Sequence, residues 1–240
     1  MNFNFIDTDL ICINDELEAN ITTISNTNHL IITIDNFLKN PEDLQDIASK
    51  QCFEKIPANK NGSPGWTSIT NLKFDQIATT AKYLSDNYFD TFHNNKVSFQ
   101  FNLFEGGMPC KYTSILPHVD QSLSAFQIYL NNPEDCYGGT NFYKHIESES
   151  DVNVEYLDSD FKKTESYHKF DNYVKETSQN NYNTILDSRQ INSSIWQLIH
   201  HVEMKYNRFV MYPSYIFHSA YIEKEWYQDI KRIGLVGFLN

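Results

Sequence analysis

The sequence has few cysteines, no excess of basic residues and no long apolar run, and each absence excludes a class of protein. Its four cysteines are widely scattered and form no CxxC pair, which argues against a disulfide framework or a zinc ribbon and favours a reducing, cytoplasmic setting. The formal net charge of −12 argues against nucleic acid as a partner, because phosphate contacts need lysine and arginine. It suits a small neutral or cationic substrate, although a solvated acidic surface explains it as well.

Targeting and membrane signals are also missing. The opening stretch MNFNFIDTDLICINDELEAN has no basic segment followed by an apolar one, so we expect no signal peptide. No stretch approaches the roughly 18 consecutive apolar residues of a membrane-spanning helix. We therefore expect a cytoplasmic protein with no membrane partner.

Apolar and aromatic residues, in contrast, are plentiful. Hydrophobic residues make up 40% and aromatic residues 15% of the 240 residues, with 17 Phe and 15 Tyr. Flat rings pack well on pleated surfaces, so this composition favours a β-rich architecture. The sequence has no internal repeat and no recognisable linker, and we expect a single domain over residues 1–240.

The first part of the chain predicts a strand followed by two helices. The β-branched run Ile31–Ile34 is typical of a buried strand, and Pro41 fits the first turn of a helix capped by Asn40. Apolar residues at helical spacing are Leu44, Ile47, Ala48 and Cys52 in the first helix and Phe74, Ile77, Ala81, Leu84 and Tyr88 in the second. We expect these helices to form a buttress over about residues 36–92.

From Val97 onward the pattern is that of short strands. The segments VSFQFNLF, AFQIYL, TNFY, RFVMY and RIGLVGFL are rich in aromatic and β-branched residues and are separated by Gly, Pro and Asn. The sequence therefore predicts a mainly β protein with flanking helices, in which helices cover one face of a β-sandwich or rolled barrel. At about residues 147–195 the pattern loosens into an acidic insertion, which is either a solvated excursion or a lid over a pocket.

Three polar residues indicate a metal site. His118 and Asp120 in PHVD would share one face of a strand, although such a triplet is common by chance. An iron site with two histidines and one carboxylate needs a second histidine from a distant strand, and His218 follows the apolar stretch RFVMYPSYIF. Surface or hydrogen-bonded structural roles are expected for the other histidines, which are His29, His93, His145, His168, His200 and His201.

A single arginine on the last predicted strand is the candidate anion anchor. Arg232 lies in the apolar segment KRIGLVGFL, where an unpaired buried charge would be costly. A planar carboxylate would satisfy it with two parallel hydrogen bonds, and iron sites of this kind commonly bind a 2-oxo acid whose far carboxylate is free. Alternatively, Arg232 lies at the solvent end of the strand beside Lys231 and pairs with Asp229. Lys231 and Arg208 are the next candidates for the anchor.

Four motifs occur in an order found in a known superfamily. The succession of PHVD, IYLNNPEDCYGGTNFY, YNRFVMYPSYIFHSA and KRIGLVGFL resembles the core of the iron(II)/2-oxoglutarate-dependent dioxygenases, and is most similar to their prolyl-4-hydroxylase-like branch. IITIDNFLKNPEDLQDIA resembles the strand–helix opening of that branch. The pairing of GGTNFYKH with YNRFVMYPSYIFHSA resembles a little-characterised bacterial group within the superfamily. The resemblance covers most of the chain outside about residues 147–195.

The resemblance implies a double-stranded β-helix (jelly-roll, cupin-like) core and an enzyme that uses iron(II), 2-oxoglutarate and O2. It implies that His118, Asp120 and His218 bind the iron, and that Arg232 and Tyr112 bind 2-oxoglutarate. The expected reaction hydroxylates an amino acid, a peptidyl residue or another small molecule, and releases succinate and carbon dioxide. Because Asp120 occupies the carboxylate position, hydroxylation is favoured over halogenation.

Several departures and alternatives stay open. The two histidines are further apart than is usual in the branch, which the insertion explains, and Gly234 stands where some relatives have Ser. The branch also often uses Lys as the anchor. A non-catalytic cupin-like protein that binds a metal or a small molecule is the main alternative to an enzyme, and a scaffold with a vestigial polar trio is another.

Other motif residues have structural explanations beside functional ones. Gly138 and Gly139 are expected to form a tight turn or a bulge. Thr140 shares a strand face with Phe142, and the sequence leaves open whether that face lines the pocket. Asn207 and Arg208 either contact the substrate or form a strand-entry turn. The oligomeric state is not predicted.

Overall fold

A computed structural model describes residues 11–24, 27–55, 66–68, 72–89, 96–105, 117–147, 149, 151, 188–191, 193–223 and 225–240. The strands in this part of the chain are β1 (Ala19–Thr23), β2 (Leu30–Ile34), β3 (Phe53–Lys55), β4 (Trp66–Ser68), β5 (Val97–Glu105), β6 (Ser124–Tyr129), β7 (Gly139–His145), β8 (Trp196–Glu203), β9 (Phe209–Pro213), β10 (His218–Tyr221) and β11 (Lys231–Leu239). The helices are α1 (Pro41–Ser49), α2 (Asp75–Tyr88) and the short 3-10 helices η1 (Pro133–Asp135) and η4 (Ser188–Gln190).

Two antiparallel sheets build the core. The large sheet has the strand order β1-β2-β9-β6-β11-β5-β4-β3, and the small sheet has the order β10-β7-β8. His118 adds a single bridge to the small sheet, opposite His218. Along the chain, β5, β6, β9 and β11 belong to the large sheet, while His118, β7, β8 and β10 belong to the small one. This alternation between two facing sheets is a jelly roll, and the prediction of a mainly β, double-stranded β-helix core is confirmed.

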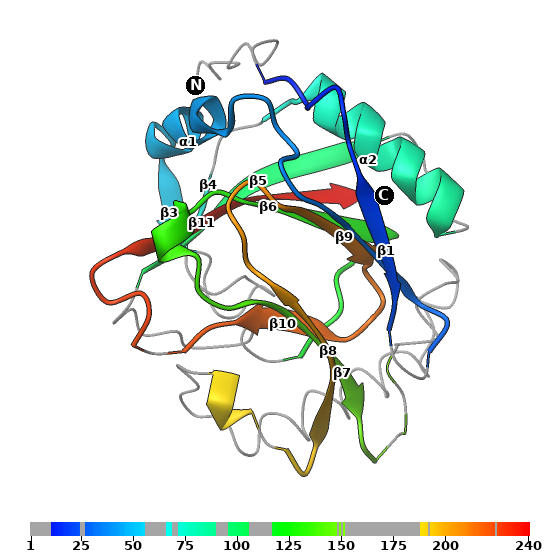
Figure 1. The fold of residues 1–240 in the computed structure, drawn as a ribbon. Helices are drawn as coiled ribbons and strands as arrows, with labels where there is room; N and C mark the ends of the chain where they lie inside the picture. The colour runs from blue at the N-terminus through cyan, green and yellow to red at the C-terminus, as the bar shows by residue number, and fades with distance from the viewer. Residues whose placement is uncertain are drawn as a thin grey trace.

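The helices cover the face of the large sheet that points away from the small one (Figure 1). Leu44 of α1 and Ile77 of α2 are fully buried in one apolar cluster with Phe126, Phe209 and Leu235 of the sheet. The two helices form where their apolar spacing predicts. Cys52 lies beyond the end of α1 at Ser49 and is exposed, Phe74 precedes α2, and Tyr88 at the end of α2 is exposed.

A second apolar cluster fills the space between the two sheets. It includes Tyr129 and Tyr212 from the large sheet and Phe142 and Val202 from the small one. The rings of Phe142 and Tyr212 meet edge to face, with their centroids 5.1 Å apart. Because successive residues of a strand point to opposite faces, the same strands of the large sheet supply both clusters.

Gly138 and Gly139 enter β7 through backbone conformations that favour glycine, with φ of 77° and 151°. A Cβ on Gly139 would lie 1.9 Å from the carbonyl oxygen of Val202, and one on Gly138 would lie 2.0 Å from that of Tyr221. The two glycines therefore let neighbouring backbones approach β7 closely. The structure records neither a turn nor a bulge at these two residues: Gly138 lies in irregular backbone just before β7, Gly139 is the first residue of the strand, and the bulge recorded in β7 lies further on, between Phe142 and Tyr143.

Two predictions concern regions that the structure covers only in part. Most of the insertion at about residues 147–195 lies outside the described residues, so its role as a lid stays a prediction, as does the single domain over residues 1–240. Among the described residues, no helix is long and apolar enough to cross a membrane.

Candidate metal centre

A pocket opens between the inner faces of the two sheets. Its lining includes His118, Asp120, His218 and Arg232, together with Asn102 of β5 and Gln127 of β6. Leu103, Ile222, Val236 and Phe238 contribute apolar surface to the same lining. The pocket thus combines a few convergent polar groups with apolar walls, which is the usual composition of a small-molecule site.

His118 and His218 lie directly opposite each other at one edge of the small sheet. The backbone N–H of His118 donates to the carbonyl of His218 at 3.0 Å, and that of His218 donates to the carbonyl of His118 at 2.9 Å. Side chains at such a pair lie on the same face of the sheet. Their imidazole centroids are accordingly 4.7 Å apart.

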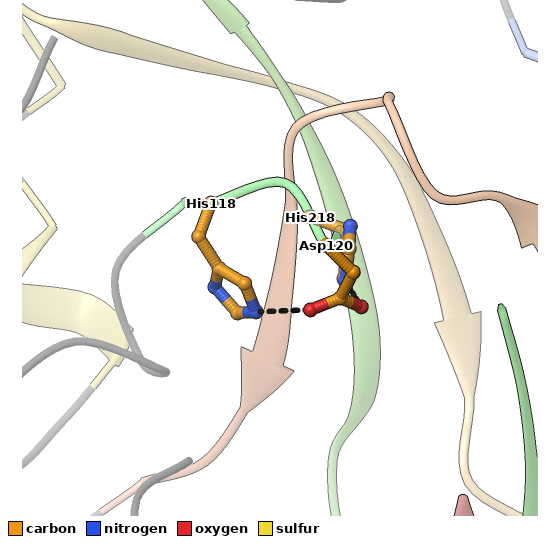
Figure 2. Close-up of side chains that lie close together, drawn as sticks. All are labelled: His118, Asp120 and His218. Atoms are coloured by element: carbon orange, nitrogen blue, oxygen red, sulfur yellow. Dashed lines mark hydrogen bonds and ion pairs between the residues drawn. The ribbon is translucent and has the colours of Figure 1, made fainter. Parts of the chain in front are cut away.

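Asp120 brings its carboxylate to both imidazoles (Figure 2). Its Oδ2 lies 3.1 Å from Nε2 of His218, and its Oδ1 lies 3.9 Å from Nε2 of His118. Its backbone N–H donates to the carbonyl of Ser214 at 3.0 Å. His118 forms only an isolated bridge and Asp120 lies two residues beyond it, so neither belongs to a named strand. The strand that the sequence predicts for the two residues is therefore not formed, although both side chains line the same pocket.

The second ring nitrogen of His218 identifies its tautomer. Nδ1 lies 2.8 Å from the carbonyl oxygen of Ile216, and because a carbonyl can only accept, Nδ1 carries the proton. In the neutral ring, the lone pair of Nε2 then faces the Asp120 carboxylate at 3.1 Å. Two acceptors at this distance need positive charge between them, either a proton on His218 or a metal ion.

The surroundings of Asp120 also favour its ionised form, which is the form that binds a metal. Burial raises the pKa of Asp120, but the positive charge and hydrogen bond of His218, together with the charge of His118, outweigh it and lower the pKa below its usual value. Asp120 is therefore ionised near neutral pH. One atom from each of the three side chains lies within 4.8 Å of the others. Two imidazole nitrogens and one carboxylate, with the remaining positions open, are the ligands that non-haem iron(II) takes in oxygenases, so the residues fit an iron ion.

Arg232 is buried in the same pocket. Its side chain is 7% exposed, and its Nη2 donates to the carbonyl of Gly139 at 3.2 Å. The guanidinium carbon lies 5.7 Å from the ring centroid of Tyr129, while Nε has no hydrogen-bond partner among the described residues. The alternative of a solvent-exposed arginine paired with Asp229 is therefore wrong.

The two other candidate anchors point elsewhere. Lys231 is 58% exposed and lies 4.0 Å from Glu105. Arg208 donates to both carboxylate oxygens of Asp35. Neither belongs to the described lining of the pocket, so Arg232 is its one cationic side chain apart from the histidines.

The sequence left open whether Thr140 lines the pocket, and it did not single out Asn102, Gln127 or Tyr212, which line it as well. Tyr129 and Thr140 share a hydrogen bond of 2.8 Å between their hydroxyls, and Thr140 lines the pocket. Tyr212 packs its ring 4.7 Å from that of His218, and burial raises its pKa well above the usual value, so it stays protonated. The alternation along β6 is the signal that identifies Gln127 and Tyr129, because both share the inward face with Ala125.

The remaining histidines have other partners. His201 Nδ1 lies 2.6 Å from Oδ1 of Asn141, and the ring of His145 packs edge-on against Trp196 at 4.9 Å. His29 lies 3.9 Å from Asp151. In the part of the chain that the structure describes, His118, Asp120 and His218 form the one group that could hold a metal. Tyr112, His93 and His168 lie outside the described residues.

Asn207 is a structural residue. Its φ of 57° is left-handed. Its side chain accepts from the backbone N–H of Leu38 at 2.9 Å and donates to the carbonyl of Leu38 at 2.8 Å. Arg208 is paired with Asp35. Of the two alternatives, a substrate contact or a strand-entry turn, the structure therefore shows the turn, and this turn connects β9 to the segment after β2.

Comparison with known proteins gives one family match. The model of DUF6445, described as a family of unknown function, matches residues 15–231. No curated protein matches the chain.

Solved structures show a distant likeness. A prolyl-4-hydroxylase from Pseudomonas putida has a TM-score of 0.40 and 9% identity, covering 83% of this chain and 82% of that one. IDO from Bacillus thuringiensis has a TM-score of 0.33 and 14% identity, covering 69% of this chain and 60% of that one. EvdMO1 has a TM-score of 0.40 and 12% identity, covering 95% of this chain and 56% of that one. Scores this low carry no argument about activity, which rests on the site itself.

Proposed function

Because the chain belongs to DUF6445, a family of unknown function, its activity has to follow from its site, and we propose that it is an iron(II)- and 2-oxoglutarate-dependent oxygenase. His118, Asp120 and His218 would hold the iron, and Arg232 would hold the far carboxylate of 2-oxoglutarate. The reaction would hydroxylate an organic substrate with release of succinate and carbon dioxide.

One observation carries the proposal: the three side chains that could hold a metal and a buried arginine line a single pocket. Arg232 donates to Gly139, and Gly139 pairs with Tyr221, which lies three residues after His218 on β10. At roughly 3.3 Å per residue, the arginine and the histidine lie at levels roughly 10 Å apart along the strand. That span suits a short 2-oxo diacid with its oxo acid end at the metal and its other carboxylate at the guanidinium.

The environment of Arg232 supports a carboxylate ligand. A guanidinium binds a carboxylate best through two parallel N–H donors, and only one contact of the Arg232 fork, to Gly139, is made within the described residues. A buried cation without an anion is costly. The bound diacid would supply that anion.

The chain's own contribution is orientation and exclusion of water. The carbonyl of Ile216 holds the His218 ring with Nε2 toward Asp120, and the backbone pairing of His118 with His218 sets the distance between the rings. Val236 and Phe238 give the pocket apolar walls. When bound, iron(II) and 2-oxoglutarate supply the oxidising power by reacting with O2.

Succinate formation tests the proposal. Purified protein given iron(II), 2-oxoglutarate and O2 should form succinate slowly even without a substrate, and the His218→Ala variant should form none above the level of free iron. A non-catalytic cupin-like protein would bind the metal but would form no more succinate than the variant does. Equal succinate from parent and variant would therefore overturn the proposed activity.

A further inference from the structure

The charges of the pocket balance once the proposed cofactor and cosubstrate are present. Among the described lining residues, Asp120 and Arg232 carry the charges, because His118 and His218 would be neutral as iron ligands. The two positive charges of iron(II) and the one of Arg232 would be matched by Asp120 and the two carboxylates of 2-oxoglutarate. Every charged group would then have its counter-ion, and the inference below rests on this part of the proposed function.

A charged substrate group would find no unpaired counter-ion among the described lining residues. Burying an ion without a counter-ion is strongly unfavourable, whereas a buried polar group needs only hydrogen bonds. The groups that can recognise a substrate are therefore the neutral polar ones. Asn102 and Gln127 are the two carboxamides of the described lining.

The two carboxamides lie on either side of Gly234. Asn102 of β5 is the direct neighbour of Gly234 in the large sheet, where it accepts a hydrogen bond from Gln100 at 3.1 Å. On the other side, Nε2 of Gln127 lies only 2.9 Å from the place where a Cβ on Gly234 would stand. The glycine thus leaves the space that the Gln127 amide occupies, which gives a physical reason for Gly234 at this position.

The side-chain amide of Gln127 is available to bind a ligand. Its side chain makes no hydrogen bond with the described residues, although it is partly buried. A carboxamide offers two donor hydrogens and an acceptor oxygen, so its natural complement is a group that also has both, such as another amide. Leu103, Val236 and Phe238 beside it would accept hydrocarbon.

We propose that the part of the substrate that enters this pocket is uncharged and presents an amide to Gln127 and Asn102, with aliphatic carbon against the apolar wall. A free amino acid, which carries an ammonium and a carboxylate, would have no counter-ion for either charge among the described lining residues. An amide can come from a peptide chain or from a small neutral molecule, and both present the same chemistry to Gln127.

Three leucine derivatives of different charge test the charge rule. N-acetyl-leucinamide is neutral, N-acetyl-leucinate is an anion and leucinamide is a cation. Their binding is measured by saturation-transfer NMR on full-length protein loaded with zinc, as a diamagnetic substitute for iron, and with 2-oxoglutarate. The neutral amide should bind about tenfold or more tightly than either ion.

Variants of Gln127 test the residue. Gln127→Leu should weaken the neutral probe by about fivefold, since one neutral hydrogen bond is lost. Gln197→Leu, the matched control at an exposed position of β8 outside the described lining, should leave it unchanged. Gln127→Glu keeps the shape and adds a negative charge, so leucinamide should become the best of the three probes. A folding defect cannot produce that reversal of preference.

The outcomes separate the two proposals. If 2-oxoglutarate binds but the neutral probe ranks no higher than the ions, or if no probe binds at millimolar concentration, the amide proposal is overturned and the proposed function stands. If 2-oxoglutarate fails to bind, the proposed function fails. Comparing N-acetyl-leucine N-methylamide with 4-methylpentanamide then identifies the source: tighter binding of the former supports a peptide substrate, and of the latter a small amide.

Discussion

His118 and His218 exchange both of their backbone hydrogen bonds, at 3.0 and 2.9 Å, across two antiparallel segments. The spacing of the two imidazoles is therefore set by the backbone ladder and not by a ligand. A site built in this way on rigid elements keeps its geometry when a ligand side chain is removed. It follows that the metal and the fold can be tested separately.

The first prediction concerns the metal. His218→Ala should lower iron(II) affinity by more than the roughly 10–100-fold that loss of an outer hydrogen-bond partner costs, because a ligand itself is removed. The backbone pairing with His118 does not depend on the imidazole, so the far-ultraviolet circular dichroism should be unchanged. Anaerobic iron titration measures the affinity.

The matched control is His200→Ala, which removes a histidine of β8 outside the metal group. It should bind iron as the parent does. Parent-like affinity in the His218→Ala variant would show that the metal ligand lies elsewhere.

Much of the fold is readable from local patterns. Strands β5, β6, β7, β9 and β11 each form at a segment rich in aromatic and β-branched residues, because alternation and side-chain shape act within a few residues. The same holds for α1 and α2, whose apolar spacing is local. His118, Asp120 and His218 can be proposed together because each lies next to such a segment.

Strand β8 does not show the pattern. Leu198 is 53% exposed although it lies in the strand, and the pairing with β7 shifts between His200 and Leu198, so that Ile199 has no opposite residue. A bulge of this kind breaks the two-residue period. Sequence alternation therefore fails where the ladder itself is irregular.

Contacts between segments that are far apart in the chain also cannot be predicted from a single sequence. Gln127 faces the pocket next to Gly234, and Asn207 binds Leu38, but no local rule joins residues so far apart in the chain. The sequence reasoning left Asn207 open between a substrate contact and a turn for this reason. Only the pairing of the strands in the folded sheet decides between the substrate contact and the turn.

The second prediction follows for Asn207. In Asn207→Ala, the backbone N–H and carbonyl of Leu38 lose their partners in a buried turn, at about 1–3 kcal/mol for each group, and alanine also tolerates the left-handed backbone poorly. The free energy of unfolding should fall accordingly in urea denaturation. Iron affinity of the folded protein should not change, and a loss of affinity with unchanged stability would contradict the structural role.

The third prediction concerns pH and the pair of Asp35 with Arg208. The hydrogen bonds and charge of Arg208 lower the pKa of Asp35 against a smaller opposing effect of burial. Since the folded pKa is below the unfolded one, the pair stabilises the fold above the usual carboxyl pKa, and this contribution is lost as the pH falls through the lowered pKa. Because Asp35 is half exposed, Asp35→Asn should cost no more than about 1 kcal/mol near neutral pH.

The measurement is urea unfolding of parent and variant from neutral pH down to about pH 3. The difference between them should shrink toward the acid end and fall with added salt. A difference that is constant over this range would mean that the carboxylate charge does not contribute.

The last prediction concerns Arg232, the group on which the choice of cosubstrate depends. Arg232→Ala removes the buried guanidinium and would leave the far carboxylate of 2-oxoglutarate unpaired, which should cost about 2–5 kcal/mol. That corresponds to a rise of roughly one to three decades or more in the 2-oxoglutarate dissociation constant. Arg232→Lys should recover part of the loss, because the charge returns without the fork of donors.

Titration of 2-oxoglutarate into the iron-loaded protein, followed by the metal-to-ligand charge-transfer band, measures this constant. Lys231→Ala is the matched control, since Lys231 is the preceding residue of β11 but is 58% exposed; its midpoint should equal that of the parent. Iron affinity should be the same in all four proteins, because Arg232 is outside the metal group. A parent-like midpoint in Arg232→Ala would mean that the carboxylate binds elsewhere, and the buried charge of Arg232 would then need a different anion.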